Sequence, residues 1–101
     1  MATSVIKKPQ TISVSVGTAD DIADLFNIIG ERSSLFIVFG SNLSNTILGA
    51  NRIHYGMVTN VNTELLDMLL FNATTGYAFL LRFNTSGTCT IKKRVSFTTF
   101  S

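Results

Sequence analysis

The second half of the sequence constrains the fold most, because three apolar runs are separated there by two short turns. The runs cover residues 65–71, 77–83 and 88–100, and the turns cover residues 72–76 and 84–87. Each turn contains Asn and Gly, the residues that tolerate the positive φ values of hairpin turns. Short apolar runs joined by such turns predict an antiparallel β-meander.

The first two of these runs are apolar on both alternating faces, whereas an isolated meander usually keeps one face in water. A second layer therefore has to cover the remaining face, and in a chain of 101 residues we predict that another copy supplies it. The predicted oligomer interface consists of five side chains from these runs: Leu66, Met68, Leu70, Leu80 and Phe83.

The composition also favours a covered surface. Charged residues make up 14% of the chain and apolar residues 46%, with a net charge of +2, whereas charged residues usually account for about 25%. So few charges leave little material for the surface of a solvated monomer. The length allows one domain, and we predict an N-terminal arm over residues 1–10 and a single β-rich domain over residues 11–101.

The first half of the chain adds further strands and one helix. Alternation predicts a strand over residues 11–16, and Thr18 with Asp20 and Asp21 is typical of a helix start that is followed by about three amphipathic turns, ending at Gly30. Residues 35–39 and 53–59 are predicted strands, and residues 40–51 a loop. Residues 65–71 also fit a helix capped by Thr63, but their place in the meander favours a strand. The predicted fold class is mainly β with one short helix, an antiparallel β-sandwich or meander completed by oligomerisation.

The residue types that carry chemistry are sparse. His54 is the single histidine, and a lone histidine on a strand is more often structural than a catalytic base. Asp20, Asp21 and Asp24 are better explained by electrostatics at a helix start than by a cation site. Cys89, the single cysteine, is predicted to be a small buried apolar thiol. We therefore expect no catalytic residues, no metal site, no cofactor and no enzymatic activity.

The segment from Leu66 to Ser96 resembles the C-terminal knob domains of bacteriophage tail fibres and related head-fibre or receptor-binding proteins. The resemblance covers about a third of the chain and rests on loose motifs: the turn at 71–77, Leu81-Arg82-Phe83, the turn at 84–88 and a basic final strand. It implies a homotrimeric virion component and adds no catalytic residue. Those knobs often place a tryptophan after Gly-Thr; Cys89 stands there in this chain, which argues against carbohydrate stacking at that position.

The preferred hypothesis is a non-enzymatic phage structural protein of the virion: a head-fibre, capsid-decoration or tail-fibre component. It would form a homotrimer and contact other virion proteins. Its loops would serve host attachment, for example to a surface glycan. No signal peptide or membrane-spanning run is visible, so we expect assembly in the host cytoplasm without membrane insertion. Lys7, Lys8 and Pro9 form the predicted attachment arm. The candidate recognition residues lie in predicted loops and turns: Asn42, Asn45, Asn60, Asn72, Thr74, Asn84 and Ser86.

Two other classes remain open. An intracellular α+β binding module for nucleic acid or a peptide would use the basic residues Arg82, Lys92, Lys93 and Arg94, and its binding would weaken steeply with salt. A small enzyme has no constellation of residues in its support. The number of copies is also open, since a dimer would satisfy the same reasoning about the covered face.

Overall fold

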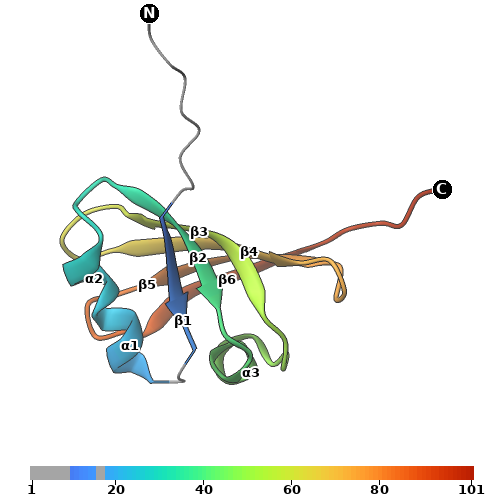
Figure 1. The fold of residues 1–101 in the computed structure, drawn as a ribbon, viewed down its shortest axis with the longest axis horizontal. Helices are drawn as coiled ribbons and strands as arrows, with labels where there is room; N and C mark the ends of the chain where they lie inside the picture. The colour runs from blue at the N-terminus through green and yellow to red at the C-terminus, as the bar shows by residue number, and fades with distance from the viewer. Residues whose placement is uncertain (1–9, 16–17) are drawn as a thin grey trace, which may run out of the picture.

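The protein folds around a single six-stranded mixed sheet with the strands in sequence order, β1 to β6 (Figure 1). The structure is a computed structural model, and it describes residues 10–15 and 18–101. The elements are β1 (Thr11–Val14), α1 (Ala19–Ala23), α2 (Leu25–Ile28), β2 (Ser34–Phe39), α3 (Ser41–Leu48), β3 (His54–Asn60), β4 (Leu66–Asn72), β5 (Tyr77–Phe83) and β6 (Cys89–Ser96).

The first two strands run parallel, and the two short helices α1 and α2 connect them. Thr18 caps α1: its hydroxyl accepts a hydrogen bond from the Asp21 N–H, and the Asp21 carboxylate accepts one from the Thr18 N–H, each at 3.3 Å. The predicted helix start is therefore confirmed. The predicted single helix is divided at Asp24, whose N–H still bonds to the Asp20 carbonyl at 2.9 Å.

A third helix, α3, occupies the segment that the sequence predicts to be a loop, so that prediction is wrong. Asn, Ser and Thr are weak helix formers, which hides the helix in the composition. The helix forms because Leu43 packs into the core and Ile47, four residues later, packs partly against it. Gly49 ends it in the left-handed region at φ 71°, the usual conformation after a helix C-terminus.

The strands β2 to β6 form an antiparallel meander, of which the sequence predicts the part from β4 to β6. The predicted strand over residues 65–71 is confirmed as β4, one residue later at each end, and Gly76 and Gly87 take positive φ values of 74° and 77° in the two predicted turns. The turns alternate between the two ends of the sheet, and the β5–β6 turn lies against the start of α1, where Gly87 approaches the Ala19 carbonyl.

One face of the sheet carries the whole core of the described residues, and all three helices cover this face. The buried side chains of the helices and of every strand from β1 to β5 join one cluster. The prediction of a mainly β chain is confirmed, but one helix becomes three. The chain alone is a helix-covered sheet rather than a sandwich, and completion by another copy stays a prediction. Most of the predicted arm, residues 1–9, lies outside the described residues.

Candidate interaction surface

The opposite face of the sheet has no helix over it among the described residues, and we call this face the open face. It is built from the outward-pointing residues of β1 to β6, which the pairing register aligns in rows across the strands. Two neighbouring rows are mainly apolar. The first contains Val38, Tyr55, Phe71, Ala78 and Val95, and the second contains Phe36, Met57, Leu69 and Leu80.

The open face holds most of the apolar surface that the described chain exposes. Seven of its eleven exposed large hydrophobic side chains belong to these two rows, and Leu69 is 52% exposed. Half-exposed side chains of this size present about 80–100 Å² each, so the seven together present roughly 600 Å². The largest apolar patch on a typical monomer is about 300–600 Å², and a patch at the top of this range marks an interaction site.

A third row crosses the same face and is polar, but its members bond to each other. The Ser34 and Thr59 hydroxyls are 2.7 Å apart. Arg82 donates two hydrogen bonds to the Asp67 carboxylate, at 2.7 and 2.9 Å, and this pairing raises the pKa of Arg82 above its ordinary value. Because these polar groups are already paired, a partner that covers the row leaves no orphaned charge in it.

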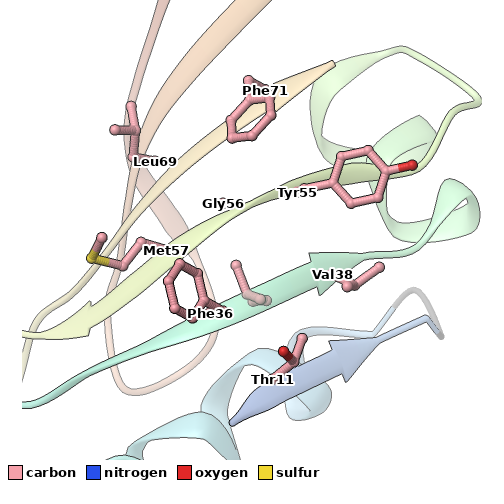
Figure 2. Close-up of a pocket in the computed structure, with 9 residues that line it drawn as sticks. Thr11, Phe36, Val38, Tyr55, Gly56, Met57, Leu69 and Phe71 are labelled. Atoms are coloured by element: carbon pink, nitrogen blue, oxygen red, sulfur yellow. The ribbon is translucent and has the colours of Figure 1, made fainter. Parts of the chain in front are cut away.

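A shallow hollow of about 440 Å³ lies in the open face over β1 to β4. Figure 2 shows its walls, with Phe36 and Met57 on one side and Phe71 and Tyr55 on the other. Gly56 contributes only backbone between them, and a Cβ at this position would lie 1.7 Å from the Leu69 carbonyl oxygen. The close approach of β3 and β4 at this point therefore requires glycine.

The predicted interface residues divide between the two faces. Leu80 lies on the open face, 45% exposed, as an interface residue should. Leu66, Met68, Leu70 and Phe83 are completely buried against the chain's own core, so the structure corrects their assignment to an interface between copies. The sequence prediction found the right strands but the wrong alternating face, because both faces of β4 and β5 are apolar.

Six exposed open-face residues were missed: Phe36, Tyr55, Met57, Leu69, Phe71 and Val95. The signal that would have found them is the parity of each strand. Once the buried His54 and Val58 assign the even positions of β3 to the core, Tyr55 and Met57 fall on the other face. Because Tyr55 pairs with Phe71 and Met57 with Leu69, the odd positions of β4 also lie on the open face.

The predicted recognition residues do not form one surface. Asn42 and Asn45 lie exposed on α3 rather than in a loop, and Asn60 is 4% exposed, with its amide donating to the Ile29 carbonyl at 2.9 Å. These placements correct the predicted loop positions of Asn42 and Asn45 and the predicted availability of Asn60. The other four lie at opposite ends of the sheet: Asn72 ends β4 and Thr74 lies in the β4–β5 turn, while Asn84 and Ser86 lie in the β5–β6 turn.

In these turns the asparagines have a structural role. The Asn72 side chain accepts from the Thr75 N–H at 3.0 Å and donates to the Ile53 carbonyl at 2.7 Å. Asn84 accepts from two backbone N–H groups at 3.0 Å each. Thr74 and Ser86 are exposed. The predicted attachment residues Lys7, Lys8 and Pro9 lie outside the described residues.

The basic residues of the last strand are separated by the alternation of β6. Lys93 lies opposite Leu80 on the open face. Lys92 and Arg94 point to the other side, where Lys92 bonds to the Ile47 carbonyl and the Arg94 guanidinium lies 4.5 Å from the centre of the Tyr77 ring. They therefore do not form the continuous basic patch that a nucleic-acid groove needs.

The histidine and the cysteine occupy structural positions. The His54 Nδ1 atom is 2.9 Å from the Ser44 hydroxyl and 3.1 Å from the Arg52 carbonyl. The His54 and Ser44 side chains are completely buried, out of reach of a substrate. Cys89 is half-buried, its thiol donates to the Ile91 carbonyl at 3.2 Å, and burial raises the pKa of this thiol. These contacts agree with the predicted structural role of His54; Cys89 is less buried than predicted.

Comparisons with known proteins add no assignment. Family models, curated proteins and solved structures were compared with the chain, and none of them matches. Among the described residues, none of the helices has the length and apolar character needed to cross a membrane.

Proposed function

We propose that this protein is a non-enzymatic structural subunit that associates with copies of itself through the open face. One observation carries the proposal: a helix-covered sheet leaves two mainly apolar rows on its other face exposed. Burying apolar surface is the main driving force of association. The roughly 600 Å² from these side chains approaches the about 800 Å² that each partner buries in a stable interface.

The electrostatics of the open face support a copy of the same chain as the partner. Two like-charged surfaces repel, but the apolar rows carry no charge except at Lys93, and the Asp67–Arg82 pair is internally neutral. A surface with a single charge at one edge strand can pack against a copy of itself with little such repulsion. The sheet face then becomes buried on both sides, which agrees with apolar residues on both faces of β4 and β5.

We further propose that the assembly is a homotrimeric bacteriophage virion component that contacts other virion proteins and presents its turns to a host surface. This part rests on the resemblance of residues 66–96 to phage fibre knobs, a segment that corresponds to β4, β5 and β6. The exposed positions Thr74 and Ser86 are the turn residues available for such contacts.

The experiment is size-exclusion chromatography with light scattering on the wild type, Leu69→Asp and Asn45→Asp. Leu69→Asp places a charge in the middle of the open face, whereas Asn45→Asp adds the same charge to an exposed position on α3. We expect the wild type and the control variant to show the mass of about three copies of the 11.0 kDa chain and Leu69→Asp that of one copy. A wild type that stays monomeric over a wide concentration range would refute the proposal.

One observation favours a second candidate, single-stranded nucleic-acid binding. The aromatic rings of Phe36, Tyr55 and Phe71 are exposed on one sheet face, as stacking platforms require. Arg82, however, is already paired with Asp67, and Lys92 and Arg94 point away from these rings. Binding of a labelled oligonucleotide that weakens steeply between low and moderate salt, and that is lost in Phe71→Ala, would favour this candidate.

A further inference from the structure

We propose that the hollow in the open face receives the tail, residues 97–101, of a second copy of this chain. The inference rests on the proposed function, since it names the segment through which the copies associate. It differs from simple face-to-face packing of two sheets, because the two contacting surfaces are then different: a tail from one copy and an open face from the other.

The tail leaves the sheet as an extended segment. The Phe97 N–H donates to the Gly76 carbonyl at 2.8 Å, and beyond this bond the chain runs away from the body of the molecule (Figure 1). Phe97 is 65% exposed and Phe100 is 94% exposed, the highest value among the exposed large hydrophobic residues. Burial of these two exposed phenylalanine side chains by a partner would lower the free energy and so favour association.

The composition of the tail suits an apolar surface. No charged side chain occurs between Val95 and Ser101, so laying the segment on the open face buries no ionised side chain of its own. Three hydroxyl side chains, on Thr98, Thr99 and Ser101, flank Phe100. In an extended segment the side chain of Phe100 points to the opposite side from that of Thr99.

The hollow offers the contacts that a phenyl ring prefers. The walls include the rings of Phe36, Tyr55 and Phe71 and the thioether of Met57. Aromatic pairs in edge-to-face or offset arrangements and sulfur–aromatic contacts are each worth about 0.5–1.5 kcal/mol beyond burial. The hollow, with a volume of about 440 Å³, is large enough for a phenyl ring, since an apolar cavity of about 150 Å³ already binds benzene.

The tail of the same copy does not line this hollow. Gly56 lies on β3, three strand spacings from β6, and its row across the sheet ends at Arg94, three residues before Phe97. These two displacements place Gly56 roughly 17 Å from Phe97. With Phe97 held by Gly76, the backbone from Phe97 to Phe100 spans about 10 Å when fully extended, so it ends short of Gly56. The tail instead projects away from its own sheet, where the open face of another copy can meet it (Figure 1).

Such an exchange forms a closed assembly when the rotation between successive copies closes. A tail and an open face are different surfaces, so reciprocal exchange closes a dimer and cyclic exchange closes a trimer. The exchanged dimer and the exchanged trimer both bury Phe100. Direct packing of two open faces, in contrast, does not require any contact with the tail. The role of the tail therefore separates the two arrangements.

The first experiment compares self-association of the wild type, a variant that lacks residues 98–101, Phe100→Ser and Ile28→Ser. The shortened variant keeps the Phe97–Gly76 hydrogen bond, and Ile28→Ser removes an exposed apolar side chain, 58% exposed, from α2 as a matched control. Far-UV circular dichroism verifies that each variant is folded. We expect at least tenfold weaker association for Phe100→Ser, a monomer for the shortened variant and wild-type behaviour for Ile28→Ser.

The second experiment measures docking directly. A fluorescently labelled peptide with the sequence of residues 95–101 is titrated with the shortened variant, and its anisotropy is recorded. We expect saturable binding that is lost when Leu69→Asp is added to the shortened variant, and lost when the Phe100 position of the peptide is Ser. A photoreactive benzoylphenylalanine at position 100 of the full chain, in a mixture of isotopically light and heavy protein, should crosslink to open-face residues of the other isotope.

The outcomes distinguish the two proposals. A shortened variant that keeps the wild-type mass, while Leu69→Asp is monomeric, overturns the tail inference and leaves self-association through the open face intact. Crosslinks that join only light to light or heavy to heavy protein, and never light to heavy, also overturn the tail inference. A monomeric wild type overturns both.

Discussion

The paired substitutions Leu69→Ala and Leu70→Ala test the assignment of the two sheet faces, on which every proposal above depends. The two leucines are neighbours on β4 and have the same side chain, but they point to opposite faces. Leu70 is completely buried in the core beneath the helices, whereas Leu69 is 52% exposed on the open face. A change of one residue in register would exchange their environments.

The expected costs differ several-fold. Leu70→Ala removes a fully buried side chain and leaves a cavity, which costs about 2–5 kcal/mol of the free energy of unfolding. Leu69→Ala removes a side chain that has buried only about half of its surface within the subunit, so about 1 kcal/mol is expected. For a domain of this size each kcal/mol lowers the melting temperature by about 4–8 °C, so the two variants should be well separated.

The assay is urea unfolding followed by far-UV circular dichroism, first at a protein concentration low enough to keep the wild type dissociated. At this concentration Leu70→Ala should lose much more stability than Leu69→Ala. At high protein concentration, association should raise the free energy of unfolding of the wild type. The Leu69→Ala variant should not show this concentration-dependent increase. Equal costs at low concentration, or a larger cost for Leu69→Ala, would refute the assignment of the faces.

Two further predictions concern single positions. Gly56→Ala should lower the free energy of unfolding by about 2 kcal/mol or more, measured by the same urea titration, because its Cβ would meet the Leu69 carbonyl 1.7 Å away and force β3 from β4; unchanged stability would contradict the close approach of the strands. Cys89 should react with iodoacetamide more slowly than free cysteine at pH 8, since burial raises the pKa of its thiol and so lowers the thiolate fraction; a rate equal to that of the urea-unfolded chain would contradict this prediction.

The sequence predicted the meander because its signals are local. Asn and Gly in the 72–76 and 84–87 turns require particular backbone conformations, and the apolar runs between them are too short for most helices. The helix start at Thr18 was predictable for the same reason, since a capping box needs only residues three apart. Each of these features is decided within a few positions of the chain.

What the sequence did not reveal depends on contacts between distant segments. The segment 41–48 is a poor helix by composition and becomes one because Leu43 packs against the sheet. The inward face of β4 was ambiguous for a different reason, since Met68, Leu69 and Leu70 are all apolar and alternation is absent there. Only pairing with β3, where His54 and Val58 are buried, decides which of them face the core.

The distribution of connections along the chain explains why the described residues leave the open face uncovered. Both helix-containing connections, from β1 to β2 and from β2 to β3, place their helices on the core side. The three later connections are turns of four or five residues, too short to cross to the other face and cover it. Among the described residues the remaining segment is residues 97–101, and five residues cannot cover six strands. The described residues of one chain therefore leave the two apolar rows uncovered. The assay on the shortened variant tests the proposal that the tail of a second copy contributes to the cover.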